Sequence, residues 1–269
     1  AKKRKILIIG GGPAGMKAAT VAASRGHRVK LIEASSMLGG QINLAERLPG
    51  RSEFGGITTN LANKLQRQNV EITLNTEVSA DFVMQEAPEV VILATGGKSF
   101  EPLIDGRENA HVVTAWQILE GKANVGSRVA IADWRCDWVG LGLAELLARQ
   151  GCHVRLACNG MVPGQTVNQY VRDNWLGKLH KLNVQTFTHL RLHGIDSEDA
   201  YFQHTLSGEP VILNDVDTLV TAFGAGSVNT LEKELKNNFN SNLHVIGDAL
   251  SPRTVEEAIL DGLKASTLI

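Results

Sequence analysis

Three glycines at fixed spacing, Gly10, Gly12 and Gly15, follow a short apolar run at residues 6–9 and open a segment with helical character. In such a turn the first glycine permits a tight exit from a strand, and the second lets the main chain approach a pyrophosphate. The third lets the helix pack closely on the sheet. Free N–H groups at the start of that helix, with the positive end of its dipole, favour phosphate there. The pattern therefore predicts a dinucleotide-binding turn.

An acidic residue extends this pattern. The next predicted strand, residues 28–32, ends on Glu33, whose carboxylate can accept hydrogen bonds from the ribose hydroxyls of an adenosine. A glycine-rich turn in an ordinary α/β domain is the alternative explanation. The preceding strand, the helix to about residue 24 and the acid in its expected place together favour the dinucleotide site.

Composition limits the other classes of function. The 269 residues are 43% hydrophobic, which is enough for two packed units. The net charge of −1 gives no reason to expect nucleic acid or a membrane surface as partner, and no apolar stretch approaches the ~20 residues that span a bilayer. Cys136, Cys152 and Cys158 lack the spacing of a disulfide framework, a CxxC pair or an iron–sulfur site. We expect isolated buried thiols, no metal site and a cytoplasmic location.

The order of predicted elements indicates the fold class. β-like runs at residues 70–74 and 89–93 continue the first unit, and a second α/β unit starts at residue 128. We expect two Rossmann-like three-layer domains, the second inserted into the first, as in the disulfide-reductase-like FAD/NAD(P)-binding fold. The expected domains are 1–98 with 219–269, and 99–218. The later predicted elements are strands at 129–132, 153–157, 184–188, 201–206, 211–213, 218–221 and 243–246, and helices at 142–150 and 252–268.

The second unit departs from a working pyridine-nucleotide site. Its first strand runs into Asp133-Trp134-Arg135-Cys136-Asp137-Trp138, and glycines come only at Gly140 and Gly142. Bulky indoles keep a backbone away from a diphosphate, and two carboxylates repel it. We therefore expect no NAD(P)H in this unit. The tryptophans indicate either core packing or a plugged site or interface, and the sequence leaves these alternatives open.

Longer segments carry a more specific resemblance. The chain resembles the C-terminal two-domain region of the trimethylamine dehydrogenase and 2,4-dienoyl-CoA reductase family, and of the N-methylproline and dimethylglycine demethylases of the same flavoprotein group. The segments that carry it are GGGPAGMKAA (10–19), LGGQINLAERLPGRSEF (38–54), VVILATGG (90–97), TAWQILEG (114–121) and IGDALSPRTVEEAILDGLKA (246–265).

The resemblance implies a role for each matching position. The glycine turn with Pro13 and Ala14 would cradle the pyrophosphate and Glu33 would hold the adenosine ribose. The strand that ends on Gly247-Asp248 would bring Asp248 to a ribityl hydroxyl if the ligand is FAD, although a Gly-Asp before a helix can also be a simple cap or turn. Further positions expected along the cofactor are Gly40, Gln41, Val78 by its backbone, Thr95 and Gly96.

The resemblance also implies a partner. In that family a barrel carrying FMN, with an iron–sulfur cluster beside it, precedes this region, and the present sequence contains neither. We expect a FAD-binding subunit or domain of an amine dehydrogenase or demethylase that relays electrons to or from centres on a catalytic flavoprotein partner, with no catalytic residue of its own. One alternative is an ADP-binding module that organises the interface with that partner. A weaker one is a stand-alone NAD(P)H-dependent flavin reductase. Whether the chain is a natural subunit or a fragment stays open.

Overall fold

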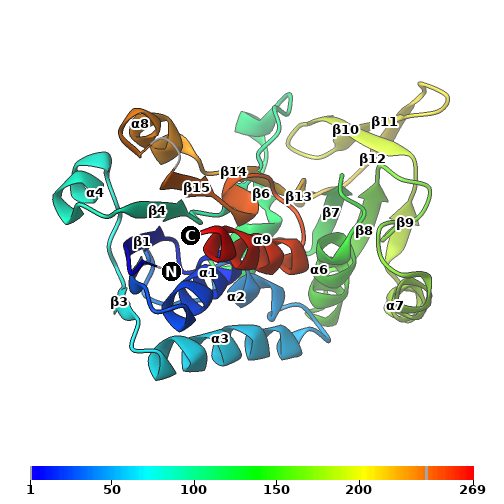
Figure 1. The fold of residues 1–269 in the computed structure, drawn as a ribbon. Helices are drawn as coiled ribbons and strands as arrows, with labels where there is room; N and C mark the ends of the chain where they lie inside the picture. The colour runs from blue at the N-terminus through cyan, green and yellow to red at the C-terminus, as the bar shows by residue number, and fades with distance from the viewer. Residues whose placement is uncertain (1, 240–241) are drawn as a thin grey trace. The chain divides into compact units, whose positions relative to one another are not determined.

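The chain folds into two compact α/β units, shown in Figure 1 in a computed structural model that describes residues 2–239 and 242–269. The first unit consists of the residues up to Glu46, Ser52–Lys98 and the residues from Ala225 on. The second unit consists of Arg47–Arg51 and Ser99–Gly224. A two-stranded sheet of β5 (Gly97–Ser99) and β14 (Ala225–Ser227) lies where the chain passes from one unit to the other.

A five-stranded parallel sheet forms the centre of the first unit. Its strand order is β15 (Leu243–Val245), β4 (Val90–Leu93), β1 (Lys5–Ile9), β2 (Arg28–Ile32) and β3 (Glu71–Thr73). Ile6 lies opposite Val29 of β2 and Val90 of β4. The central strand β1 is therefore hydrogen-bonded on both edges, and both its faces need a cover of helices.

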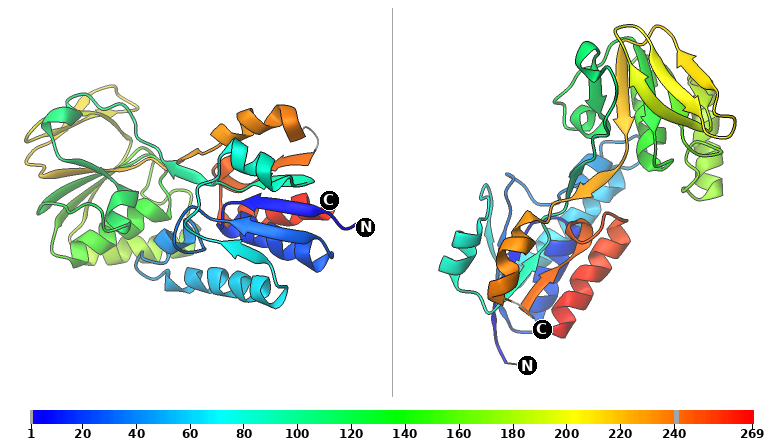
Figure 2. Two further views of the ribbon diagram at one scale, coloured as in Figure 1. Left: turned by 90° about the vertical axis from the view of Figure 1, so that its left-hand side faces the viewer. Right: turned by 90° about the horizontal axis from the view of Figure 1, so that it is seen from above.

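Alternating side chains of β1 divide the core of the first unit into two clusters. Ile6 and Ile8 pack against α1 (Pro13–Ser24), α3 (Gly55–Arg67) and α9 (Val255–Leu268). Leu7 and Ile9 point to the opposite face, towards α4 (Ala80–Glu86) and α8 (Thr230–Phe239). Period-two alternation in a fully apolar strand thus builds a helix–sheet–helix sandwich, and Figure 2 shows helices on both faces of this sheet.

Helices α1 and α9 lie against each other because their facing side chains are small. Ala14 and Ala18 of α1 meet Gly262 of α9, where an added Cβ would stand 2.4 Å from the Ala14 carbonyl oxygen and 3.0 Å from the Ala18 nitrogen. The hydroxyl of Ser266 donates to the Ala18 carbonyl oxygen at 2.9 Å. Close helix packing therefore fixes α9 on α1, the helix that follows the glycine turn.

The second unit has a parallel sheet and a smaller antiparallel one. The parallel order is β6 (Val112–Thr114), β13 (Thr218–Ala222), β7 (Arg128–Asp133), β8 (His153–Cys158) and β9 (Gln185–Phe187), and the antiparallel order is β10 (Leu190–Ile195), β11 (Ala200–His204) and β12 (Pro210–Leu213). Ala130, Ala132 and Leu219 of the parallel sheet pack on Leu190 and Phe202 of the antiparallel sheet. Helices α6 (Trp138–Arg149) and α7 (Gln169–Lys181) form the third layer (Figure 1).

The remaining short elements lie in the connections. These are α2 (Ile42–Ala45), η1 (Ser52–Phe54), η2 (Arg107–Asn109), α5 (Ala115–Leu119) and η4 (Gly247–Ala249).

Most differences from the expected element boundaries have local causes. Helix α9 begins at Val255, not at residue 252, because Thr254 and Glu257 form a capping box. Helix α6 begins at Trp138, before the expected residue 142, because the Asp137 carboxylate accepts from the Val139 N–H at 2.9 Å. Strand β13 pairs with β6 and β7, so the chain returns to the first unit at Ala225 and not at residue 219.

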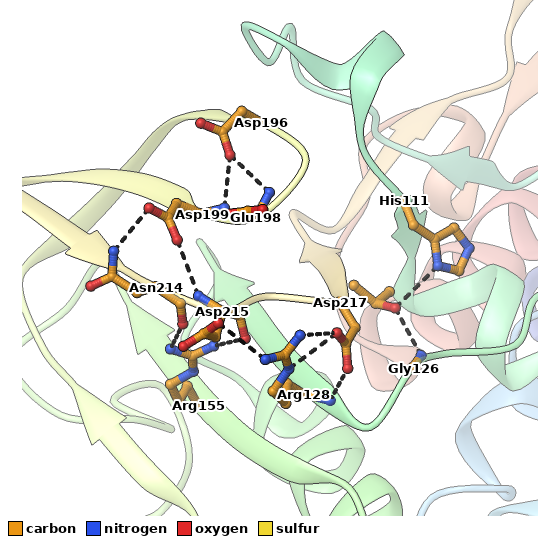
Figure 3. Close-up of polar contacts among 11 residues, drawn as sticks. His111, Gly126, Arg128, Arg155, Asp196, Glu198, Asp199, Asn214, Asp215 and Asp217 are labelled. Carbon is orange, nitrogen blue, oxygen red and sulfur yellow. Dashed lines mark hydrogen bonds and ion pairs between the residues drawn. The ribbon is translucent and has the colours of Figure 1, made fainter.

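Two arginines of the parallel sheet in the second unit bind the connection between β12 and β13, as Figure 3 shows. The Arg128 guanidinium contacts the Asp217 carboxylate at 2.6 Å and the Asp215 carboxylate at 3.1 Å. The buried Arg155 donates to the carbonyl oxygens of Asn214 and Asp215. Both arginines thus bind the segment between β12 and β13, so we assign Asp215 and Asp217 a structural role.

A buried histidine makes the stability of the first unit depend on pH. The Nδ1 of His27 accepts from the Arg4 N–H at 3.2 Å, and burial, followed by the charges of Arg25 and Arg4, lowers the pKa of His27 below its ordinary 6.5. Below pH 6.5 the unfolded chain therefore binds a proton more readily than the folded chain. We expect urea midpoints to fall as the pH drops through this range, and His27→Asn, which keeps an acceptor, to reduce that dependence. An unchanged slope in the variant would assign the pH effect to other groups.

Gly262 and Gly177 form a matched pair for testing the α1–α9 contact. A Cβ at Gly262 collides with the α1 backbone, whereas one at Gly177 in α7 meets nothing within 4 Å. We expect Gly262→Ala to lower the free energy of unfolding by about 1–3 kcal/mol through overpacking. Gly177→Ala should raise it by up to about 1 kcal/mol through helix propensity. Equal effects of the two substitutions in urea unfolding would refute the close packing of α1 on α9.

Candidate functional site

The glycine turn of the first unit connects β1 to α1, and two of its glycines are required by the fold itself. Gly10 has a φ of +108°, and a Cβ there would stand 2.1 Å from the carbonyl oxygen of Ala94. A Cβ at Gly15 would stand 1.9 Å from the carbonyl oxygen of Gly10. Only glycine allows α1 to come this close to the ends of β1 and β4.

Gly12 is different, because the fold does not require a glycine at this position. Its φ of −74° and ψ of −178° suit any residue, and an added Cβ would meet nothing within 4 Å. Gly12 is the N-cap residue of α1, and no side chain caps that helix end; Pro13, at the first helical position, has no N–H to satisfy. The open space therefore lies beside an uncapped helix N-terminus, where a phosphate group would be stabilised.

Glu33 is held next to this turn by main-chain groups. Its Oε2 accepts from the Gly11 N–H at 2.6 Å, and its Oε1 accepts from the Ser35 N–H at 2.8 Å. Each carboxylate oxygen keeps acceptor capacity, because a carboxylate offers about four lone-pair sites. The geometry thus fixes an acid beside the glycine turn that can still accept from two ribose hydroxyls.

The LGGQ loop, residues 38–41, contacts both the glycine turn and Asp248, which follows β15. Gly39 donates its N–H to the Gly11 carbonyl oxygen at 2.9 Å, and a Cβ at Gly40 would stand 3.2 Å from the Gly12 Cα. The Gln41 side-chain amide donates to Asp248 Oδ2 at 2.8 Å, joining residues 207 positions apart. The loop therefore lies on the glycine turn and reaches the C-terminal part of the sheet.

Asp248 does not cap the closing helix. Helix α9 is capped by Thr254, and Asp248 lies in η4, where its Oδ1 accepts from the Arg253 N–H at 3.2 Å. Of the alternative roles as a simple cap or turn, the structure thus shows the turn, because the carboxylate holds the segment that leads into the helix. Its other oxygen meets Gln41.

The remaining predicted positions line the same end of the sheet. Gly247 has a φ of +61°, and a Cβ there would stand 2.8 Å from the Ala14 Cβ, so η4 lies against the start of α1. The Thr95 hydroxyl donates to the Val228 carbonyl oxygen, and Gly96, with φ +74°, accepts from the Val228 N–H at 3.0 Å. The partly buried side chain of Val78 packs against the cluster under α4 and α8.

The corresponding turn of the second unit is closed by its own carboxylates. Asp133 is 2% exposed, its Oδ1 accepts from the Cys136 N–H at 2.9 Å, and burial, then the charge of Asp137, raises the pKa of Asp133 well above its usual range. A Cβ at Gly140 would stand 2.1 Å from the second oxygen of Asp133. Acids occupy the place where a phosphate would need N–H groups.

The tryptophans of this region serve separate contacts. Trp134 is 43% exposed and stacks on Phe223 with ring centroids 5.9 Å apart. The ring of Trp138 meets the ring of the buried Trp175 edge-on, with centroids 5.5 Å apart. The Arg51 guanidinium carbon lies over the Trp138 ring, 3.9 Å from the centroid of that ring. A cavity of about 250 Å³ opens beside this second group, lined also by Tyr170, Asn174 and Lys178. Core packing describes the buried Trp175 but not the half-exposed Trp134. A plugged site or an interface at these tryptophans stays a prediction.

Cys136 and Cys158, whose spacing matches no known cysteine motif, lie close to each other in the structure. Cys136 follows β7 and Cys158 ends β8, and both thiol groups hydrogen-bond to Gly160. Adjacent parallel strands bring these residues together, and spacing alone gave no signal of this.

Within residues 2–239 and 242–269, no group of three or more His, Cys, Asp or Glu side chains could hold a metal ion. In the same described residues, no helix has the length and apolar character to cross a membrane.

Comparison with known proteins assigns the family. The model of the pyridine nucleotide-disulphide oxidoreductase family matches residues 4–256. The chain therefore belongs to this oxidoreductase family, and membership implies a flavin-binding fold, which confirms the expected fold class.

Named relatives confirm the resemblance to amine dehydrogenases and demethylases. The chain is 36% identical over 202 residues to N,N-dimethylglycine/sarcosine dehydrogenase of Chromohalobacter salexigens, covering 73% of this chain and 29% of that protein. It is 32% identical to a probable N-methylproline demethylase of Rhizobium meliloti, covering 97% of this chain and 43% of that protein. The structure of 2-naphthoyl-CoA reductase matches all of this chain with a TM-score of 0.91 and 31% identity, over 40% of its own length. The chain thus spans less than half the length of these three proteins.

Gly12 and Gly15 allow ligand binding to be separated from folding. We expect Gly12→Ala to leave the thermal midpoint of the nucleotide-free protein unchanged and to weaken nucleotide binding at least about tenfold, because the methyl group fills the open space. Gly15→Ala should instead lower the midpoint, since its Cβ meets backbone. Titration with ADP and thermal melts measure both. Undiminished ADP affinity in Gly12→Ala would show that the phosphates bind elsewhere.

Proposed function

We propose that the first unit binds FAD and serves as an electron-relay module of a flavin-dependent amine dehydrogenase or demethylase. The single observation that carries the proposal is the space beside Gly12, which an ordinary side chain could occupy without strain and which lies at an uncapped helix N-terminus. A fold that needs Gly10 and Gly15 for packing has no packing reason for Gly12. A diphosphate supplies that reason.

The residues around this space would each hold one part of the cofactor. The turn from Gly10 to Gly15 would receive the diphosphate on main-chain N–H groups, and Glu33 would orient the adenosine ribose. The backbone of Val78 would meet the adenine. Gly40, Gln41, Thr95, Gly96, Gly247 and Asp248 would lie along the rest of the molecule. When bound, the isoalloxazine supplies the electron-accepting chemistry, and the protein supplies position.

The contact between Gln41 and Asp248 favours FAD over ADP. These two polar side chains extend the site beyond the part that an ADP molecule would need, and they meet at 2.8 Å. Asp248 also keeps acceptor capacity, because one of its oxygens accepts from Gln41 and the other from Arg253. A ribityl chain offers hydroxyl donors for such a carboxylate.

The second unit would not bind NAD(P)H. Its turn places the buried Asp133 and the helix-capping Asp137 where a diphosphate would have to approach. A negatively charged ligand gains nothing from a helix end that a carboxylate already caps. Electrons would therefore come from, or go to, a redox centre outside this chain.

That outside centre would lie on a catalytic flavoprotein subunit or domain. The named relatives are more than twice as long as the region they share with this chain. By the resemblance, the additional part would carry FMN and an iron–sulfur cluster and would convert the substrate, in the cytoplasm. Within the described residues we assign no catalytic side chain and no metal ligand.

One observation favours the ADP-binding structural module as a second candidate. A relay flavin without a hydride donor on the same chain has less purpose, and the closed turn of the second unit removes that donor. In this version bound ADP would organise the first unit for contact with the catalytic partner.

Heat release of the nucleotide separates these candidates. We expect a yellow supernatant with flavin absorbance, and mass spectrometry of the native protein should report one FAD per chain. Asp248→Ala should weaken FAD binding while leaving ADP binding nearly unchanged, because Asp248 serves the flavin half alone. A supernatant with adenine absorbance only would leave the ADP module as the function.

The electron donor is tested on the same preparation. Anaerobic NADH or NADPH should leave the flavin oxidised, whereas a catalytic partner reduced by its amine substrate should reduce it. Bleaching of the flavin by NADPH alone would contradict our interpretation of the Asp133 turn.

A further inference from the structure

We propose that Cys136 and Cys158 are an oxidisable dithiol pair, in which peroxide converts the two thiols into a reversible disulfide within the second unit. This inference is independent of the nucleotide in the first unit. It concerns two buried nucleophiles that the proposed function does not use.

The sheet register brings the two residues together. Asp133 and Cys158 are register partners at the ends of the parallel strands β7 and β8. The chain then turns back at Cys136, whose φ of +49° is uncommon for a residue with a side chain. The Cys136 N–H donates to Asp133 Oδ1 at 2.9 Å, which holds this residue above the end of its own strand. Cys136 thereby lies beside the neighbouring strand end.

Both sulfur atoms hydrogen-bond to the main chain of Gly160. The Cys136 Sγ accepts from the Gly160 N–H at 3.2 Å, and the Cys158 Sγ donates to the Gly160 carbonyl oxygen at 3.5 Å. Cys136 is 5% exposed and Cys158 is fully buried, so a molecule as small as hydrogen peroxide suits the site better than a protein thiol.

The hydrogen bonds give the two sulfurs different roles. The Cys158 side chain, and then the N–H groups of Gly160 and Asn159, lower the pKa of Cys136 to about 7, against the opposing effect of burial. The same pairing and burial raise the pKa of Cys158. Cys136 is therefore the nucleophile, since the thiolate is the reactive form, and Cys158 is the resolving thiol.

The chemistry balances with peroxide as the oxidant. The Cys136 thiolate attacks one peroxide oxygen, the O–O bond breaks, and hydroxide leaves and takes up a proton to become water. The Cys158 sulfur then attacks the sulfenic acid, loses its proton, and releases the second water as the S–S bond forms. Two thiols and one hydrogen peroxide give one disulfide and two waters, and a dithiol reductant reverses the change.

The third cysteine provides a matched control. Cys152 lies in the same unit and is more exposed, but its Sγ hydrogen-bonds to the Gly126 carbonyl oxygen and has no thiol partner. Its pKa is raised by burial, which keeps it protonated. Cys152 should therefore stay reduced while the pair oxidises.

The experiment treats the full chain, with its bound nucleotide, with a small excess of hydrogen peroxide and then with N-ethylmaleimide. Non-reducing peptide mapping should find a 136–158 disulfide, one alkylated cysteine per chain at Cys152, and full recovery of all three thiols after dithiothreitol. Cys152→Ser should form the same bond at the same rate. Cys158→Ser should stop at a sulfenic acid on Cys136 that dimedone traps, and Cys136→Ser should lose thiols at least about tenfold more slowly.

Peptide mapping of the wild-type chain is sufficient to refute the proposal. The test therefore remains valid even if one of the variants fails to fold. Three alkylated cysteines after peroxide treatment, a disulfide that includes Cys152, or a bond between two chains would each refute the pair. Equal thiol loss in Cys136→Ser and wild type would refute the assignment of the nucleophile.

Discussion

The contact on which the first unit depends is backbone against backbone at the start of α1. Gly10 lies against the Ala94 carbonyl, and Gly15 lies against the Gly10 carbonyl, at distances that exclude any Cβ. This contact sets the helix N-terminus at the carboxyl ends of β1 and β4. The open side of Gly12, the held carboxylate of Glu33 and the LGGQ loop all take their places from it. The candidate ligand site therefore arises from a packing constraint, with few side chains committed to it.

The two units show how one sheet geometry can carry opposite electrostatics. In the first unit an acid at the end of the neighbouring strand, Glu33, accepts from the turn and leaves the helix end uncapped. In the second unit the acids lie in the turn itself, where Asp133 is buried and Asp137 caps α6. The first arrangement leaves N–H groups for an anion, and the second already satisfies them. Fold similarity alone would assign both units the same ligand, but the positions of three carboxylates distinguish them.

Sequence patterns predicted the parts of this structure that depend on local chemistry. The apolar strands, the glycine turn and the acid at Glu33 follow from period-two alternation and from motif spacing, and the observed elements agree with them. Strand β10 was not predicted, because its alternation is short and a bulge between Leu192 and Gly194 interrupts it. The sheet to which β13 belongs, the contact of Gln41 with Asp248 and the meeting of Cys136 with Cys158 depend on strand order and on long-range pairing. A single sequence carries no local signal for such pairings.

The link between Gln41 and Asp248 has a consequence for the order of events during synthesis. Residues early in this sequence provide the glycine turn, but β15 and α9, which complete the sheet and cover α1, come much later in it. A nascent chain can form β1, α1 and β2 early, yet that intermediate leaves one face of α1 bare and gives Gln41 no contact with Asp248. The candidate site is therefore complete only once β15 and α9 have joined the sheet.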